Sequence, residues 1–269
     1  MKRINHIQII QPLNSGGTAD IYLGVDLNDG SPVAIKELKS SFFKSDFVRQ
    51  KFLEEANQYL YLNHPNIVKL KDFIKKDESH YLIMEYVEGK NLSEHISTVT
   101  GPIPIQNIAL FLNEVLSAIA YVHDKGLIHL DIKPSNIMLS NENTIKVIDF
   151  GISHDSGQSK LETVMGSPSY MSPEQITGKN IDYRSDIYSL GITLYEMVTG
   201  KLPFSNYETR EEMFEAIKNH KIPYVKVPYS FDLVHQDKIN QIINKATKKE
   251  PKDRYQTCEE FQIDLLQFI

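Results

Sequence analysis

Short runs of apolar residues, several of them alternating with polar ones, fill the first third of the chain and predict β-strands. Three such runs, separated by Gly, Asn and Asp residues that favour turns, are His6–Leu13, Asp20–Asp26 and Val33–Leu38. Asn28-Asp29-Gly30 between the second and third runs predicts a tight hairpin. A helix is predicted at about Asp46–Leu62, followed by strands at Ile67–Ile74 and Tyr81–Tyr86.

From about residue 91 the spacing of the apolar residues becomes helical. In Gln106–His123 they recur every three or four positions, and Gly126 stands just beyond as a stop signal. Ser185–Thr199 is apolar on most faces and predicts a buried helix, and Asp237–Ile269 predicts two or three more helices. We therefore expect an α+β fold of two lobes within one domain, 1–269: a small, mainly β lobe over about 1–86, a hinge at about 85–89 and a larger, mainly α lobe over about 90–269. A cleft between lobes is a common ligand site.

Composition places the chain among ordinary globular proteins. Its 269 residues can build one large core or two small ones, and 41% hydrophobic with 24% charged residues is a common balance. The formal net charge of −6 gives no support for binding nucleic acid, which usually needs a basic surface. Cys258 is the single cysteine, so no intrachain disulfide is possible and a reducing, cytoplasmic compartment fits. No stretch approaches the ~18–20 uninterrupted apolar residues of a membrane helix, so no membrane segment is expected.

The segment 129–136, His-Leu-Asp-Ile-Lys-Pro-Ser-Asn, carries the most specific chemical pattern. Asp131 offers a carboxylate that can accept the proton of an incoming hydroxyl, and Asn136 offers an amide oxygen that can hold a metal ion. Lys133 can place a positive charge near a transferring phosphoryl group. The pattern resembles the catalytic loop of protein kinases, H-R-D-x-x-x-x-N, with Leu130 at the Arg position and His129 in structural support. A surface turn that happens to contain Asp and Asn is the alternative.

A second motif, Asp149-Phe150-Gly151, closes the apolar run 145–148 shortly after this loop. It resembles the metal-binding motif of protein kinases. Two oxygen donors from Asp149 and Asn136, together with ATP phosphates, would suit Mg²⁺, which takes few protein ligands and keeps water. Mn²⁺ is the second candidate ion.

Lys36 ends the tetrapeptide Val-Ala-Ile-Lys, which resembles the kinase strand whose lysine contacts the α- and β-phosphates. On the predicted helix, Phe52, Glu55, Ala56 and Tyr59 share one face. An unpaired carboxylate on such an apolar face would be costly. We therefore expect Glu55 to pair with Lys36, with solvation of Glu55 at the surface as the alternative.

The glycine-rich loop that covers ATP in protein kinases is incomplete here. The register G-x-G-x-x-G-x-V falls on Asn14, Gly16, Ala19 and Ile21, so only the middle glycine is retained, and Gly17 is an additional one. The backbone amides of the loop are still expected to reach the β-phosphate, with a poorer fit. These amides belong to Ser15, Gly16, Gly17 and Thr18.

The adenine ring is expected between apolar residues of both lobes. By resemblance to the family these are Ile21 and Ala34 above the ring and Met138 below it. Met84 resembles the gatekeeper, and the backbone from Glu85 to Val87 resembles the hinge that hydrogen-bonds the base. Simple core packing is the alternative for all of these side chains.

The segment 166–174, Gly-Ser-Pro-Ser-Tyr-Met-Ser-Pro-Glu, resembles the end of a kinase activation segment, G-T-x-x-Y-x-A-P-E. Ser167 takes the Thr position that, together with Lys133, is typical of Ser/Thr kinases. The family pattern implies an ion pair between Glu174 and Arg254. It also implies that Asp186 accepts hydrogen bonds from the catalytic-loop backbone.

The resemblance spans about residues 8–266 and is closest to bacterial eukaryotic-like (Hanks-type) Ser/Thr protein kinases. It implies the bilobal kinase fold, transfer of the ATP γ-phosphoryl group to Ser or Thr hydroxyls of protein substrates with Mg²⁺, and autophosphorylation. Many members are the cytoplasmic part of a single-span receptor and dimerise through the first lobe. Both a membrane-tethered parent and a homodimer therefore remain open for this chain.

Leu130 is the informative departure from the family, because the usual arginine grips a phosphorylated activation-loop residue. His154 stands where a second cation often helps. A phosphate on Thr163 would therefore lack the charge-assisted pairing that orders such loops. We expect catalysis not to depend on phosphorylation of the loop. Drift after regulation moved elsewhere and an attenuated enzyme are the other interpretations.

Two other functions fit parts of the pattern. A nucleotide-binding pseudokinase that acts as a scaffold is supported only by the incomplete glycine-rich loop. An antibiotic- or metabolite-directed kinase of the same core fold is disfavoured by the activation segment and the Glu174–Arg254 pattern.

Overall fold

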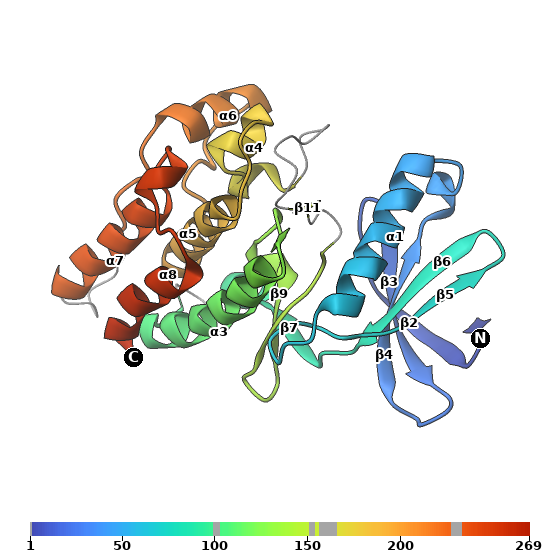
Figure 1. Cartoon of the computed structure of the whole chain (residues 1–269). Helices are drawn as coiled ribbons and strands as arrows, with labels where there is room; N and C mark the ends of the chain where they lie inside the picture. The colour runs from blue at the N-terminus through green and yellow to red at the C-terminus, as the bar shows by residue number, and fades with distance from the viewer. Residues whose placement is uncertain (1, 99–102, 151–153, 156–165, 227–232) are drawn as a thin grey trace. The chain divides into compact units, whose positions relative to one another are not determined.

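The computed structural model describes residues 2–98, 103–150, 154–155, 166–226 and 233–269 (Figure 1). By its internal contacts the chain divides into two compact units. Unit 1 comprises residues 1–88 with 149–151, and unit 2 comprises residues 89–148 with 152–269. Unit 1 is a sheet with one long helix and unit 2 is mainly helical, which confirms the predicted α+β class.

Unit 1 is built on a six-stranded antiparallel sheet of order β1-β2-β3-β4-β6-β5. Its strands are β1 (Arg3–Ile4), β2 (Ile7–Ser15), β3 (Ala19–Asp26), β4 (Pro32–Leu38), β5 (Leu70–Lys76) and β6 (Ser79–Glu85). A 3-10 turn, Ser40–Phe42, leads from β4 into helix α1 (Asp46–Tyr61), whose first turn is capped by the Ser45 side chain. The predicted hairpin is present between β3 and β4, where Gly30 has φ +76° and its N–H donates to Asp26 O.

Strand β5 begins later than the sequence predicts, at Leu70 instead of Ile67. Ile67 forms only an isolated β-bridge, and its N–H donates to His64 O at 3.1 Å in a turn, so the continuous ladder with β6 begins at Leu70. Apolar residues alone therefore placed the strand start wrongly.

Alternation along β4 divides unit 1 into two apolar clusters. Val33 and Ile35 lie in the cluster formed with β1, β2, β5 and β6. Leu38, on the opposite face, lies in the cluster that also holds Phe52 and Ala56 of α1. Side chains alternate with period two along a strand, so Lys36 lies on the same face of the sheet as Leu38. This face is the one covered by α1.

Unit 2 consists mainly of helices. They are α2 (Leu92–Thr98), α3 (Ile105–Asp124), α4 (Pro173–Thr177), α5 (Arg184–Thr199), α6 (Arg210–Asn219), α7 (Leu233–Ala246) and α8 (Cys258–Leu265). Short 3-10 turns occur at Pro134–Asn136, Pro168–Tyr170, Pro251–Asp253 and Leu266–Phe268. Strands β7 (Gly89–Asn91), β9 (Ile137–Ser140) and β10 (Ile145–Val147) form one small sheet, and β8 (Leu127–Ile128) pairs with β11 (His154–Asp155).

Helices α3 and α5 form the centre of unit 2. Helix α5 is buried on nearly every face, as its sequence predicts. Helix α3 is long and apolar enough to cross a membrane by length and composition, but 56% of that stretch is buried inside the protein, where α3 packs against α8 and α5. Its hydrophobicity is therefore explained by core packing.

Candidate active site

In unit 1, Lys36 is the centre of a buried charge cluster. Its Nζ donates to Glu55 Oε1 and Oε2 at 2.7 and 2.8 Å, and to Asp149 Oδ1 at 2.8 Å. The ion pair expected from the helix face is therefore present. Only 3% of Glu55 is exposed, which excludes the alternative of a solvated surface carboxylate.

The cluster perturbs both charges of the ion pair. Burial raises the pKa of Glu55 to about 7, and the charge of Asp149 adds to this effect, in spite of the opposing influence of Lys36. Burial alone would lower the pKa of Lys36, but the carboxylates of Asp149 and Glu55 outweigh it and raise this pKa above its usual value. Lys36 therefore remains a cation at neutral pH, which its predicted contact with phosphates would require.

Asp149 is held in an unusual backbone conformation, with φ +65°. This region is strained for residues with a side chain, and such strain persists where surrounding contacts impose it. Here the Asp149 N–H donates to the Tyr59 hydroxyl at 2.9 Å, and the Phe150 ring packs edge-on against the Tyr59 ring at 5.2 Å. Tyr59 of α1 thus positions the predicted metal-binding carboxylate, a role that the sequence did not predict. Gly151, the last residue of the motif, lies outside the described residues.

The predicted nucleotide loop is the turn between β2 and β3. The Gly16 N–H donates to Ala19 O at 2.9 Å, and the Ser15 N–H donates to Asn14 Oδ1 at 2.8 Å. A Cβ on Gly16 would lie 3.3 Å from Ala19 O, whereas a Cβ on Gly17 would meet nothing within 4 Å. Gly16, the glycine that the family register retains, is therefore at a position where the turn leaves little room for a side chain.

Polar and charged side chains next to this loop hold it by hydrogen bonds and an ion pair. The Ser15 hydroxyl donates to Asp20 Oδ1 at 2.6 Å, and Lys39 Nζ donates to Gly16 O while lying 3.6 Å from Asp20 Oδ1. The Lys39 N–H also donates to Thr18 O at 2.9 Å. We call Ser15, Asp20 and Lys39 the loop clasp. The sequence did not predict the clasp, although Asp20 and Lys39 each follow a buried residue, Ala19 and Leu38.

The residues expected around adenine are placed on both units. Ile21 is opposite Lys36 across β3 and β4, and Ala34 is opposite Met84 across β4 and β6, so each pair shares a face of the sheet. Glu85 ends β6, and Val87 follows it in unit 1, whereas Met138 lies on β9 of unit 2. Their contact with adenine stays a prediction.

In unit 2, the side chains expected to perform catalysis converge on Asp131. Its Oδ2 accepts from Lys133 Nζ at 2.7 Å and from Asn136 Nδ2 at 3.1 Å, and its Oδ1 accepts from the Ser167 N–H at 2.8 Å. Lys133 Nζ also donates to Ser167 Oγ at 2.6 Å. The catalytic loop and the end of the activation segment therefore share one polar network.

The backbone of the catalytic loop rests on Asp186 at the start of α5. The carboxylate accepts from the N–H groups of His129 and Leu130, both at 2.8 Å, which confirms the predicted contact. It also accepts from His123 Nε2 at 2.8 Å. Asp186 is fully buried, so these donors are what makes a carboxylate tolerable there.

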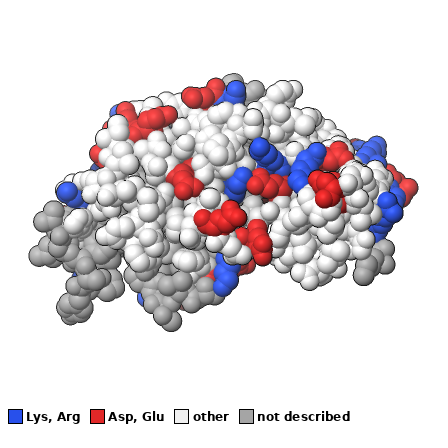
Figure 2. Space-filling model, turned by 90° about the horizontal axis from the view of Figure 1, so that it is seen from below, with Lys and Arg blue, Asp and Glu red and all other residues white. Residues whose placement is uncertain are grey.

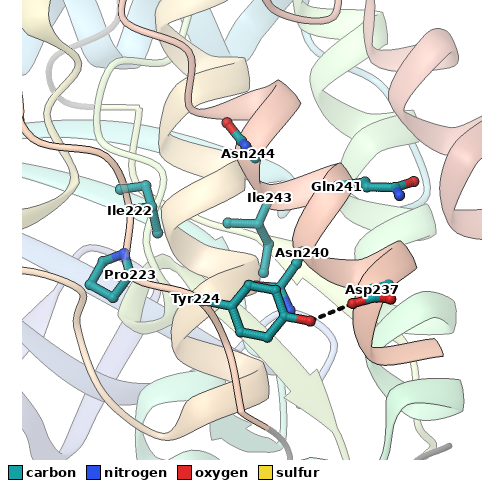
Figure 3. A pocket seen from close by; sticks show the side chains of 8 residues that line it. All are labelled: Ile222, Pro223, Tyr224, Asp237, Asn240, Gln241, Ile243 and Asn244. Atoms are coloured by element: carbon teal, nitrogen blue, oxygen red, sulfur yellow. Dashed lines mark hydrogen bonds between the residues drawn. The ribbon is translucent and has the colours of Figure 1, made fainter. Parts of the chain in front are cut away.

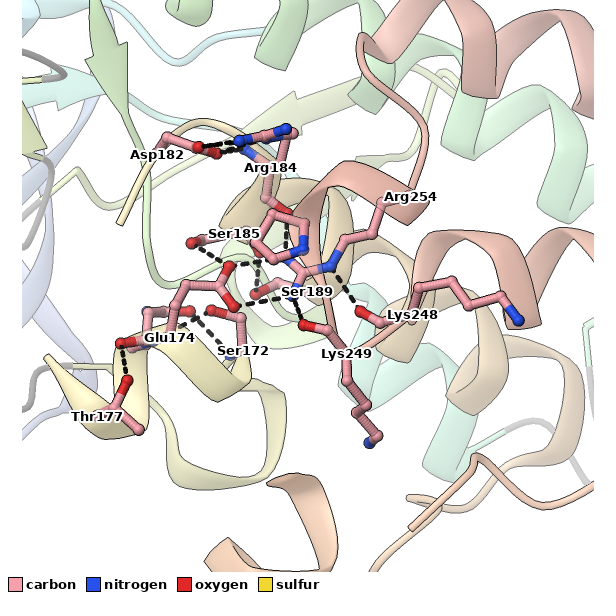
Figure 4. Close-up of polar contacts among 12 residues, drawn as sticks. Ser172, Glu174, Thr177, Asp182, Arg184, Ser185, Ser189, Lys248, Lys249 and Arg254 are labelled. Carbon is pink, nitrogen blue, oxygen red and sulfur yellow. Dashed lines mark hydrogen bonds and ion pairs between the residues drawn. The ribbon is translucent and has the colours of Figure 1, made fainter. Parts of the chain in front are cut away.

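Figure 4 shows the Glu174–Arg254 pair, which is also present as predicted. Arg254 Nη1 and Nη2 donate to Glu174 Oε1 and Oε2 at 2.6 and 2.8 Å, and the Ser185 hydroxyl donates to Oε1 at 2.6 Å. The guanidinium also donates to backbone carbonyls of Arg184, Lys248 and Lys249. This bidentate pair fixes the end of the activation segment to α5 and to the segment before α8.

Thr163 is the predicted phosphorylation position, and Ser156 and Ser159 are two further hydroxyl residues of the same segment. Ser156, Ser159 and Thr163 lie outside the described residues. For His154 the backbone is described, and it pairs with Ile128 between β11 and β8.

Two features of the described surface lie outside the predicted site: its charge distribution and a pocket in unit 2. On the face drawn in Figure 2, acidic and basic side chains are interspersed. A pocket of about 280 Å³ between the segment 222–224 and α7 contains none of the predicted site residues (Figure 3). Several of its polar side chains are hydrogen-bonded within the protein, because Tyr224 donates to Asp237 and the Asn240 amide binds the Val225 N–H and carbonyl.

Residues 7–265 match a family model described as "Protein kinase domain". The chain is 35% identical to the serine/threonine-protein kinase PrkC of Bacillus subtilis, over 98% of this chain and 41% of that protein. It is 34% identical to the serine/threonine-protein kinase PknB of Mycobacterium leprae, over 94% of this chain and 41% of that protein. The chain thus spans about two-fifths of the length of these relatives.

Proposed function

The chain belongs to the protein kinase domain family, and from that premise we propose that it is a protein serine/threonine kinase that transfers the ATP γ-phosphoryl group with Mg²⁺. The observation that carries the proposal is the network around Asp131, where a carboxylate, an ammonium and an amide meet at the end of the activation segment. A pseudokinase would not need this arrangement of groups.

The residues of unit 2 would handle the incoming hydroxyl. Asp131 would accept its proton as the oxygen attacks the γ-phosphorus, and Lys133 would stabilise the negative charge on the transferring group. Ser167 holds both side chains in register, through its N–H to Asp131 and its hydroxyl to Lys133. Serine and threonine hydroxyls of proteins, including this one, are the acceptors we propose.

The nucleotide phosphates would be bound by Lys36 and by the metal ion that Asp149 and Asn136 would hold. Lys36 would contact the α- and β-phosphates, oriented by Glu55. Mg²⁺ would be held by Asp149 and Asn136, and it would neutralise the charge that develops on the phosphates. The donor types suit this ion: 44% of the Asp149 side chain is exposed, and Asn136 directs its amide nitrogen to Asp131, so its amide oxygen would be the atom that binds the metal.

We also propose that activity does not require phosphorylation of the activation segment. Leu130 is buried in an apolar cluster with Ile128 and Ile181, so the residue at the arginine position packs instead of presenting a cation. The end of the segment is held by Asp131 and Arg254, without a phosphate. This supports an enzyme whose catalytic geometry is built into the unmodified chain.

The test is phosphotransfer from radiolabelled ATP with Mg²⁺, comparing wild type with Asp131→Asn on a generic protein substrate. We expect label in the substrate and in the kinase itself, and a loss of ~10³-fold or more in the variant, because the proton acceptor is gone. Nucleotide binding without transfer by the wild type would instead indicate a pseudokinase. Label only in small molecules would indicate a metabolite-directed kinase.

A further inference from the structure

The backbone of Leu130, immediately before Asp131, is strained and held from two sides. Its φ is +64°, a region that β- and γ-substituted residues rarely occupy. Its N–H donates to Asp186 Oδ1 at 2.8 Å, and its carbonyl accepts from Gln175 Nε2 at 2.9 Å. Strain of this kind persists only where the surroundings impose it, so both contacts bear on the orientation of Asp131.

Gln175 is well suited to hold that carbonyl. It is fully buried in α4, just after Glu174, and its own backbone N–H donates to Ser172 Oγ at 3.3 Å. Its Oε1 accepts from the Ser172 N–H at 3.0 Å, which completes a capping box and leaves Nε2 directed at Leu130. The side chain is therefore fixed at the oxygen end and donates at the nitrogen end.

The side chain of Leu130 joins the same two segments by apolar contact. It packs with Ile128, which precedes the catalytic loop, and with Ile181, which follows α4. Only 2% of Leu130 is exposed. Leu130 thus connects the catalytic loop to α4 through its carbonyl and to the segment after α4 through its side chain.

We infer that Gln175 is a positioning residue for Asp131, and that it makes the connection that a phosphate and an arginine would make in a phosphorylation-dependent kinase. The inference rests on the proposed kinase function. The Leu130 carbonyl and the Asp131 N–H belong to one peptide plane, so rotation of this plane moves the Asp131 Cα and its carboxylate. Gln175 resists that rotation because its Nε2 donates to the Leu130 carbonyl, and Gln175 itself directly follows the end of the activation segment.

The first variant is Gln175→Met, which keeps the length of the side chain but removes both its donor and its acceptor. We expect kcat to fall ~10-fold or more while KM for ATP stays within ~2-fold, because the loss concerns the geometry of Asp131 and not nucleotide binding. The matched control is Gln262→Met. Gln262 Nε2 donates to the Asn113 carbonyl at 3.0 Å, so this change also removes one amide-to-backbone bond in unit 2. It should lower Tm by less than Gln175→Met does, because Gln262 is only partly buried, and leave kcat within ~2-fold of wild type.

A second variant, Gln175→Glu, separates positioning from packing. Its carboxylate keeps an acceptor for the Ser172 N–H, but it can donate to the Leu130 carbonyl only when it is protonated. Burial raises the pKa of such a group, so protonation is expected at mildly acidic pH. The ratio of variant to wild-type kcat should therefore fall as the pH rises from about 6 to about 8, measured well below Tm.

Titration of the other ionisable groups near residue 175 affects kcat of the variant and of the wild type alike, so it does not change the ratio. These groups are Asp186 on the Leu130 N–H, His129, and Glu174 with its partner Arg254, and all of them are present in both proteins. A flat ratio, or a Gln175→Met variant with kcat within ~2-fold of wild type, would overturn the inference. If the wild type itself transfers no phosphate, the proposed function fails instead, so the two failures are distinguishable.

Discussion

Single buried charges in this chain are stabilised by specific partners. Glu55 has Lys36, Glu174 has Arg254, and Asp186 accepts three donors. Such pairs give little net stability, but breaking one by removing a single partner leaves an uncompensated charge in the interior. Substitutions at these positions should therefore affect folding as well as any catalytic role.

Arg254→Met tests this at a residue for which we propose no contact with ATP, metal or substrate. The change leaves Glu174 buried without its cation, so we expect the free energy of unfolding to fall by about 3–5 kcal/mol. Denaturant titration measures this loss. Arg210→Met, at an exposed arginine of α6 whose guanidinium lies 5.0 Å from the Phe214 ring centroid, is the control and should change stability by no more than about 1 kcal/mol. A small effect of Arg254→Met would mean that the pair is not formed as described.

Among the elements, the turn between β2 and β3 departs most from the family pattern. It lacks two of the three motif glycines, yet it closes through the Gly16 N–H and the Ala19 carbonyl. The loop clasp holds it from the outer side of the sheet, where Asp20 pairs with Lys39, on the face opposite Lys36. The clasp therefore offers a physical replacement for the conformational preference of the missing glycines.

Lys39→Met should release the loop and weaken nucleotide binding. Loss of the bonds to Gly16 O and Asp20 leaves the turn less ordered, so KM for ATP is expected to rise ~3–10-fold with little change in kcat. Lys39→Arg keeps a cation that can donate and should restore most of the affinity. Lys75→Met, at an exposed lysine of β5, serves as the control. An unchanged KM in Lys39→Met would show that the clasp does not support ATP binding.

Contacts that follow from local periodicity could be predicted, and contacts that need tertiary geometry could not. The helix face that carries Glu55 gave its pairing with Lys36, because three- and four-residue spacing fixes which side chains point inward. The family motifs gave the Glu174–Arg254 pair and the support from Asp186. The bond from Gln175 to Leu130 could not be found this way, since it depends on a positive φ that the sequence does not signal.

At the scale of the whole molecule, the proposed catalytic residues are held in place by contacts of the unmodified chain. Within the described residues, the segment from Ser167 to Gln175 makes contacts with Asp131, Leu130 and Arg254 that need no phosphate. On the other side of residues 156–165, β11 is paired with β8. Both flanks of the segment that contains the predicted phosphorylation position are therefore held by the unmodified chain.

Combined replacement of Ser156, Ser159 and Thr163 by Ala tests this picture for the whole catalytic domain. We expect phosphotransfer to a protein substrate to stay within ~10-fold of wild type, because a phosphate would find leucine at the arginine position and would add no charge-assisted bond there. The measurement is kcat on protein treated with phosphatase, for wild type and for the triple variant. Asp131→Asn sets the level of inactive enzyme. If the triple variant falls to that level, the loop requires its own phosphate, and the buried Leu130 must be compensated by a cation elsewhere.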